Sequence, residues 1–312
     1  MSLARAGARD YARSMLAKDI QQVGVIGAGQ MGGGIAQVCA ATGLEVRLSD
    51  ASVERAQSGK DKIGKILQKQ VDKGKFEASA RQALLDRIVP VGGVADFSSC
   101  DLVVEAATED VETKIRIFKA ADEVMKPGAL LASNTSSISI TRLAGQTSRP
   151  EQVIGMHFMN PVPLMKLVEI VRGVQTNADT MKTVSELSER LGKTVIHSKD
   201  QPGFVVNRML VPFLNEACFV LQEGLGTPED IDQGAKLGLN HPMGPLELAD
   251  LIGLDTLLFI AEVLHREFGD DKYRPATLLR NLVAAGWYGR KVGRGFYVYD
   301  ERGQKTGRAF EH

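Results

Sequence analysis

The first two thirds of the chain alternate between short apolar runs and amphipathic stretches. Runs such as VGVI at 23–26, LVV at 102–104 and ALLA at 129–132 contain no polar side chain, which is typical of parallel strands buried on both faces. Helical spacing follows several of them, as over residues 54–74. The pattern predicts an α/β domain with a mostly parallel sheet over residues 21–201.

The pattern changes at Gln201-Pro202-Gly203, where the last strand signal ends. An apolar helix containing Pro212, expected to kink there, comes next, and further helical stretches follow around 228–237, 245–252, 254–268 and 275–285. We therefore expect an all-α C-terminal domain over 202–312 and treat residues 1–20 as an N-terminal extension. Several of these helices are apolar on more than one side, which predicts a homodimer formed through this domain, or else a bundle packed over the sheet domain.

The turn after the first apolar run has the spacing G-x-G-x-x-G, at Gly27, Gly29 and Gly32. Between a strand and a helix, these glycines permit the tight turn, the approach of a pyrophosphate and close helix packing. The next strand, LEVRLSD, ends at Asp50, 18 positions after Gly32, where a carboxylate can bind an adenosine ribose and disfavours a 2′-phosphate. The combination predicts a Rossmann-type dinucleotide-binding domain that uses NAD; an ordinary glycine turn is the alternative.

The segment GMHFMNPVPLMKLVE, residues 155–169, contains two short apolar segments joined by a turn with two prolines. Prolines end strands and favour chain reversal. An antiparallel hairpin would bring His157 within hydrogen-bond reach of Glu169, as a general base and its orienting carboxylate require. A lone histidine on an apolar strand is more often a satisfied core residue. The carboxylate across the turn favours the catalytic interpretation.

Two other polar groupings are candidates for ligand contacts. Glu109 and Lys114 lie near the start of the helix predicted after LVVEAA, where an exposed charge pair is the alternative. The sequence NTSS at 134–137 follows a predicted strand, at the end where ligands of open α/β sheets bind. One of these four residues could instead simply cap the next helix.

The charge balance limits the classes of binding partner. Lys plus Arg and Asp plus Glu both total 38, so no bulk field attracts nucleic acid or an anionic membrane. Lys65, Lys69 and Lys73 nevertheless form a basic ridge, which is either a solvated helix face or a site for a phosphorylated part of the substrate. No apolar segment approaches the roughly 20 residues that span a bilayer.

The cysteines and the N-terminal stretch bear on location. Three cysteines without paired or metal-like spacing predict buried thiols, no metal site and a reducing compartment. Arginines in residues 1–20 suggest a transit segment and the mitochondrial matrix, but Asp10 and Asp19 favour the cytoplasm.

Seven ordered segments between about Val23 and Tyr299 resemble the NAD-dependent L-3-hydroxyacyl-CoA dehydrogenases, including the bacterial 3-hydroxybutyryl-CoA dehydrogenases. They are GAGQMGGGIAQ, EAATED, SNTSSISIT, GMHFMNPVPLMKLVEIV, DQPGFVVNRML, MGPLELADLIGLD and GRGFY. The resemblance implies the reversible NAD-dependent oxidation of a 3-hydroxyacyl-CoA, such as the short-chain 3-hydroxybutyryl-CoA, to a 3-ketoacyl-CoA in fatty acid or butanoate metabolism.

The resemblance also implies roles for individual residues. His157 would be the catalytic base and Glu169 the carboxylate that orients it, while Ser136 and Asn207 would hydrogen-bond near the reacting carbon or the nicotinamide. Lys73 would contact coenzyme A. The cofactor contacts would be Gly27, Gly29, Gly32, Asp50, Glu109, Lys114 and Asn160.

Two positions depart from the family's pattern. Asp110 stands where asparagine is common, and Ile66 stands where the family has a serine associated with coenzyme A. Two rival functions also stay open, namely a dehydrogenase of a free hydroxy acid or sugar acid, as in lambda-crystallin-like relatives, and a non-catalytic NAD-binding structural protein. The lysine ridge discriminates against a free acid, which would give it no phosphate to bind.

Overall fold

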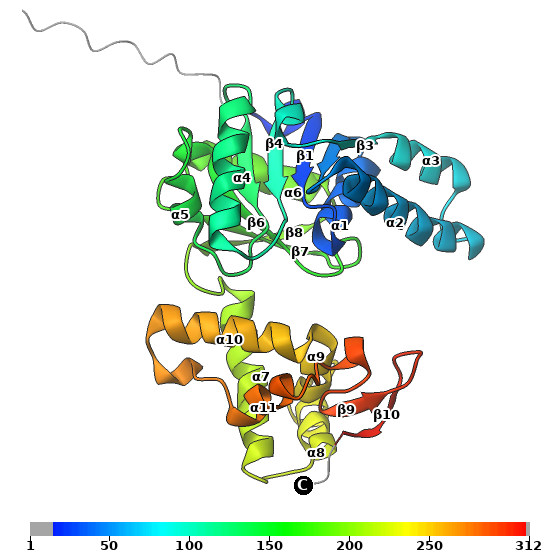
Figure 1. Ribbon diagram of the computed structural model, residues 1–312, viewed down its shortest axis with the longest axis vertical. Helices are drawn as coiled ribbons and strands as arrows, with labels where there is room; N and C mark the ends of the chain where they lie inside the picture. Colours follow the sequence, from blue (N-terminus) through cyan, green and yellow to red (C-terminus); the bar gives the residue numbers. More distant parts are fainter. Residues whose placement is uncertain (1–14, 310–312) are drawn as a thin grey trace, which may run out of the picture. The chain divides into compact units, whose positions relative to one another are not determined.

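The chain divides into two compact units, Met1–Gln201 and Pro202–His312. Both are drawn in Figure 1, a computed structural model that describes residues 15–309. Within those residues no helix is both long enough and apolar enough to cross a bilayer. The described residues also contain no group of three or more His, Cys, Asp or Glu side chains placed to hold a metal ion.

The N-terminal unit is built on one sheet of eight strands in the order β3-β2-β1-β4-β5-β6-β7-β8. Every neighbouring pair is parallel except β6 and β7, which are antiparallel. This confirms the predicted mostly parallel sheet. The strands are β1 (Gln22–Ile26), β2 (Glu45–Ser49), β3 (Ile88–Val91), β4 (Leu102–Glu105), β5 (Leu130–Ser133), β6 (Val153–Phe158), β7 (Leu167–Arg172) and β8 (Thr194–Lys199).

Helices connect these strands, and polar side chains fix where several of them begin. Ser52, Asp110, Ser139 and Asn177 each accept a hydrogen bond from a first-turn amide, so each is an N-cap. Figure 1 shows the second and third helices extending together away from the sheet. The helices are α1 (Gln30–Ala41), α2 (Val53–Asp72), α3 (Ala78–Asp86), α4 (Val111–Val124), α5 (Ile140–Ala144) and α6 (Ala178–Arg190), with short 3-10 turns at Ala17–Asp19, Val94–Phe97 and Pro150–Gln152.

Part of the predicted N-terminal extension packs on the sheet domain. Thr183 of α6 donates its hydroxyl to the Met15 carbonyl at 2.6 Å, and Arg190 donates to the Ile20 carbonyl at 3.0 Å. Ile20 is fully buried in the core of this unit. Residues 15–20 are therefore bound to α6, whereas residues 1–14 of the predicted extension lie outside the described part of the chain.

The C-terminal unit is mainly helical, as expected, but it also contains a small two-stranded sheet that the apolar pattern did not predict. The first helix of the C-terminal unit is continuous through Pro212. The elements are α7 (Val206–Gln222), α8 (Pro228–Gln233), a π-helical turn (Gly234–Gly238), α9 (Pro245–Ile252), α10 (Leu254–Phe268), α11 (Thr277–Ala284), β9 (Tyr297–Tyr299) and β10 (Lys305–Arg308), with 3-10 turns at Asp271–Tyr273 and Arg290–Val292.

A buried carboxylate explains the unpredicted strand β9. Asp250 of α9 is fully buried and accepts hydrogen bonds from the Phe296 and Tyr297 amides at 2.9 and 3.0 Å and from the Tyr299 hydroxyl at 3.0 Å. These bonds tie β9 to α9 at positions about 47 residues apart in the sequence. A strand positioned by one distant side chain leaves no periodic signal in its own sequence.

Candidate active site

The carboxyl ends of β1, β2, β4 and β5 meet at one edge of the sheet, because these neighbouring strands are parallel. Gly27 follows β1, Asp50 follows β2 and Asn134 follows β5. Ligands of open α/β sheets bind at this edge. The topology therefore brings the glycine turn, the predicted ribose carboxylate and the hydroxyl-rich loop together.

A different structural feature accounts for the presence of glycine at each of the three positions of the turn. Gly27 has φ +100°, and a Cβ there would lie 2.5 Å from the Ala106 carbonyl oxygen. A Cβ on Gly32 would lie 1.7 Å from the Gly27 carbonyl oxygen, so only glycine lets α1 pack on the turn. A Cβ on Gly29 would meet no protein atom within 4 Å. Protein packing therefore requires two of the glycines, while the space beside the third is open to a ligand.

The N-terminus of α1 fits a dinucleotide phosphate. Gly29 is its N-cap residue and supplies no side-chain hydrogen bond to the first turn. The first amides of the helix therefore lack a side-chain cap and, with the helix dipole, favour an anion.

Asp50 lies beside this turn as an ionised carboxylate. It accepts hydrogen bonds from the Ala28 and Ala51 amides, both at 2.8 Å, and pairs with the Arg55 guanidinium at 2.9 Å. Partial burial raises the pKa of Asp50, but these hydrogen bonds and the Arg55 charge outweigh it and hold the pKa below its usual value. The position suits a ribose diol and repels a 2′-phosphate, although Arg55 offsets part of that repulsion.

The predicted hairpin forms, with β6 and β7 antiparallel and His157 directly opposite Glu169. His157 Nδ1 lies 2.6 Å from Glu169 Oε2. Glu169 is fully buried and His157 is 6% exposed, so solvent barely screens the interaction. The short contact fixes the orientation of the ring, and a proton on Nδ1 leaves Nε2 as the basic atom of the neutral imidazole.

The hydroxyl-rich loop is bound to both Glu109 and the hairpin. Glu109 Oε1 accepts from the Ser136 amide at 2.7 Å and from its hydroxyl at 3.1 Å, while Oε2 accepts from the Thr135 hydroxyl at 2.7 Å. Asn134 Oδ1 accepts from the Phe158 amide, next to His157, at 2.9 Å. Glu109 thus holds Ser136 in place, and Asn134 connects this loop to the strand that carries the imidazole.

Lys114 is not the exposed charge considered as the alternative for this position, because it is only 1% exposed. Its Nζ lies 2.7 Å from both carboxylate oxygens of Glu105 and 3.8 Å from Glu109. Glu105, which the sequence did not single out, is fully buried and also accepts from the Ala107 amide at 2.8 Å and the Ser133 hydroxyl at 2.7 Å. A charged residue closing a four-residue apolar strand was the signal that could have identified it.

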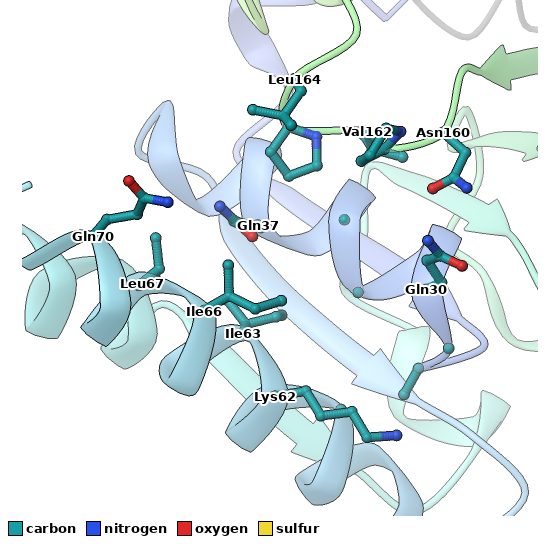
Figure 2. A pocket seen from close by; sticks show the side chains of 17 residues that line it. Gln30, Gln37, Lys62, Ile63, Ile66, Leu67, Gln70, Asn160, Val162 and Leu164 are labelled. Carbon is teal, nitrogen blue, oxygen red and sulfur yellow. The ribbon is translucent and has the colours of Figure 1, made fainter. Parts of the chain in front are cut away.

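A pocket of about 520 Å³ opens between α1, α2 and the turn after β6 (Figure 2). Ile63 and Ile66 of α2 line it, as do Val162 and Leu164 of the turn after β6, which Figure 2 shows on the far side of α1 from α2. Asn160, a predicted cofactor contact, lies at the same turn and lines the pocket together with residues of the glycine turn. The walls are mostly apolar, so the pocket suits an uncharged, flexible group better than a phosphate.

The predicted lysine ridge does not line this pocket. Lys65, Lys69 and Lys73 are all exposed, and the charged residue among the lining side chains is Lys62. Ile66, at the position of the family's serine, is 55% exposed and lines the pocket. For most of the ridge, the geometry is that of a solvated face.

Asn207 belongs to the C-terminal unit, in the first turn of α7. Two residues of positive φ precede it, Gly203 at +76° and Phe204 at +50°. Its neighbour Arg208 lies over the rings of Phe268 and Tyr273, with its guanidinium carbon 4.8 and 4.5 Å from their centroids. These contacts fix the start of α7, while the contact of Asn207 with the reacting groups stays a prediction.

Comparison with known proteins matches both units to one family. Residues 22–201 match the model of the 3-hydroxyacyl-CoA dehydrogenase NAD binding domain, and residues 203–299 match that of the 3-hydroxyacyl-CoA dehydrogenase C-terminal domain. The chain is 56% identical over 276 residues to a probable 3-hydroxybutyryl-CoA dehydrogenase of Deinococcus radiodurans, covering 88% of this chain and 99% of that protein.

Two solved structures extend the comparison. The (S)-3-hydroxybutyryl-CoA dehydrogenase PaaH1 of Ralstonia eutropha has a TM-score of 0.87 and 52% identity, over 90% of this chain and 100% of that one. A diketoreductase has a TM-score of 0.79 and 29% identity, over 90% and 99%. The resemblance and the NAD cofactor predicted from the motifs are thereby confirmed, and the chain belongs to the 3-hydroxyacyl-CoA dehydrogenase family.

Proposed function

We propose that this protein catalyses the reversible NAD-dependent oxidation of a short-chain 3-hydroxyacyl-CoA, such as 3-hydroxybutyryl-CoA, to the 3-ketoacyl-CoA. The observation that carries the proposal is the buried contact of 2.6 Å between His157 and Glu169 in the same unit as the glycine turn. A histidine oriented by a carboxylate can move one proton in either direction. The 3-hydroxybutyryl-CoA dehydrogenases among the relatives support the substrate class.

In the proposed reaction, His157 Nε2 takes the proton of the substrate's 3-hydroxyl while the C3–H bond breaks. The glycine turn and Asp50 would hold NAD, which would supply the acceptor for the hydride that leaves C3. The C3–O bond becomes a carbonyl, and the imidazolium later releases its proton to solvent. Glu169 holds the Nδ1 proton and stabilises the positive charge that develops on the ring. In the reverse direction His157 donates the proton to the ketone oxygen.

Ser136 and Asn207 are proposed to hydrogen-bond the substrate oxygen or the nicotinamide amide. Glu109 accepts from the Ser136 hydroxyl at 3.1 Å, which orients the serine oxygen as an acceptor for a ligand donor. The cofactor contacts proposed for the sheet edge are the glycine turn, Asp50, Glu109, Lys114 and Asn160. Lys114 acts on this edge through its pairing with Glu105 and its 3.8 Å approach to Glu109.

The apolar pocket beside α2 is proposed to hold the pantetheine arm of the acyl-CoA. That arm is long, flexible and uncharged, which suits walls formed by Ile63, Ile66, Val162 and Leu164. Ile66 contributes an apolar contact where the family's serine would donate a hydrogen bond. Lys73 remains the proposed contact for a coenzyme A phosphate, at the exposed end of α2.

The test compares acetoacetyl-CoA with free acetoacetate, each with NADH and with NADPH, by absorbance at the nicotinamide band. We expect turnover of the thioester with NADH. Turnover of the free acid alone would instead support the alternative function, a free-acid dehydrogenase. The structural similarity to a diketoreductase is the reason for testing this alternative. Inactivity toward both, with NADH still bound, would support a non-catalytic NAD-binding protein.

The matched variant is His157→Gln, in which the amide replaces the imidazole. We expect turnover to fall by roughly 10²–10⁴-fold, as for a lost acid-base group, while NADH binding is retained. An undiminished rate would refute the assignment of His157 as the proton carrier.

A homodimer formed through the C-terminal unit and a cytoplasmic location are part of the proposal. Large apolar side chains are exposed in that unit, including Met209 at 65%, Leu237 at 77% and Leu239 at 62%. Light scattering should give twice the chain mass, and Leu237→Asp should lower it if that face is the interface. The described cysteines are free and buried, which supports a reducing compartment.

A further inference from the structure

A buried lysine with no described counter-ion stands beside the substrate pocket. Lys193, in the turn between α6 and β8, is 7% exposed. Within residues 15–309 no carboxylate lies within 4.0 Å of its Nζ. Burial lowers the pKa of its ammonium below the usual value. An unpaired buried charge is costly, so its partners show what it stabilises.

Those partners are two backbone carbonyls of the turn that joins β6 to β7. Lys193 Nζ donates to the Val162 carbonyl at 2.5 Å and to the Met165 carbonyl at 2.8 Å. Hydrogen bonds from a charged donor are about twice as strong as neutral ones, and these two span four residues of the turn. The ammonium therefore stabilises one conformation of 162–165.

The same turn forms one wall of the pocket. Val162 is buried and packs on α1 so closely that a Cβ on Gly34 would lie 2.8 Å from it. Leu164, by contrast, is 77% exposed and lines the pocket opposite α2 (Figure 2). Gly34, which has no side chain, thus permits the close packing of Val162 on α1, and Lys193 holds two carbonyls of the same turn.

We infer that Lys193 is a positioning residue for the thioester arm of the substrate, because it holds the turn 162–165 in the conformation that presents Leu164 to the pocket. The inference rests on the proposed function, since it takes the pocket as the site of the pantetheine arm. Lys193 itself does not touch the reacting atoms. It acts on substrate binding through Val162 and Met165.

The test uses Lys193→Met, which keeps the length of the stem but has no donor. We expect KM for acetoacetyl-CoA to rise on the order of tenfold with kcat nearly unchanged, the pattern of lost uniform binding. The truncated thioester acetoacetyl-N-acetylcysteamine lacks most of the arm, so its kcat/KM should be the same in variant and parent. Lys193→Arg keeps the charge and the hydrogen-bond donors, so its KM for acetoacetyl-CoA should be close to that of the parent enzyme.

Lys119→Met is the control, because Lys119 is exposed on α4 and its change should leave both substrates unaffected. A fall of kcat/KM by the same factor for both thioesters, or a fall of kcat alone, would overturn the inference and make Lys193 a general structural residue. If Lys193→Met does not fold, Lys193→Gln, whose shorter amide cannot reach both carbonyls, is measured with the same two thioesters. Failure of the parent enzyme to reduce either thioester would instead contradict the proposed function.

Discussion

The buried pair of Glu105 and Lys114 gives the sharpest quantitative prediction. Both side chains are at most 2% exposed, and the ammonium lies 2.7 Å from each carboxylate oxygen. Glu105→Gln removes the negative charge and leaves the shape almost unchanged. The ammonium then stays buried, with Glu109 at 3.8 Å as its remaining described carboxylate.

The loss of folding stability in Glu105→Gln comes from the burial of the unpaired Lys114 ammonium rather than from the loss of the attraction itself. Breaking a buried ion pair by removing one partner costs about 3–5 kcal/mol, because the other charge is left uncompensated. Replacing both partners removes that cost, so Glu105→Gln combined with Lys114→Met should destabilise by less than Glu105→Gln alone. The double-mutant cycle should therefore show a coupling energy of about 2–3 kcal/mol, the upper part of the range for residues in direct contact.

The assay is urea unfolding followed by two probes. Far-UV circular dichroism reports on both units, while Trp287, the only tryptophan of the chain, reports on the C-terminal unit. The loss of stability should affect the circular dichroism transition more than the tryptophan transition. Additive effects of the two substitutions, or a cost below about 1 kcal/mol for Glu105→Gln, would refute the view that the pair compensates two buried charges.

Three further predictions follow from named contacts. Gly29→Ala should leave thermal stability nearly unchanged but weaken NADH binding about tenfold or more. Gly32→Ala should lower both thermal stability and NADH affinity, since its Cβ would lie 1.7 Å from a backbone oxygen. Equal NADH affinity of Gly29→Ala and the parent would contradict the phosphate site. Glu169→Gln keeps an acceptor for His157 but loses about 1–2 kcal/mol of charge-assisted hydrogen bonding, so kcat should fall about 5–30-fold at constant KM. A variant with the parent's rate and pH profile would show that the carboxylate is only structural. Burial raises the pKa of Asp250 from 3.8 to about 6, so its contribution to stability is largest below pH 4 and is lost as the pH rises through 6. Relative to Asp250→Asn, which does not titrate, the parent's free energy of unfolding should drop by about 2 kcal/mol between pH 4 and pH 7 when followed by Trp287 fluorescence, and a constant difference would contradict the assignment.

The sequence predicted the parts of the site that short-range rules control. Strand ends, glycine spacing and the proline turn are local signals, and parallel pairing then brings their residues to one edge without further information. His157 and Glu169 come together because a hairpin fixes their register, with the pair directly opposite. A twelve-residue separation is short enough for one turn to determine the contact.

Contacts between distant segments could not be predicted in this way. For Lys114, a surface charge stayed open as the alternative to a ligand contact, because nothing in its own helix shows that a carboxylate of the preceding strand lies below it. Lys193 gave no signal, since its partners are backbone carbonyls that every residue carries. The same holds for Asp250 and β9. In each case the informative side chain is polar and buried, and burial depends on packing that periodicity does not report.

A difference of one position along a strand decides whether a carboxylate at this edge is structural or available to a ligand. Glu105 is level with Ile26, the last residue of β1, and with Ser133, the last residue of β5, so it lies within the sheet and is fully buried. Asp50 comes one residue after Ser49, which is the residue level with Ile26, so it extends past the sheet and its side chain is 16% exposed. Glu105 accordingly neutralises an internal lysine, while Asp50 keeps an ionised carboxylate at the rim of the glycine turn. In this sheet, the position of each acid relative to the last paired residue of its strand therefore separates the two roles.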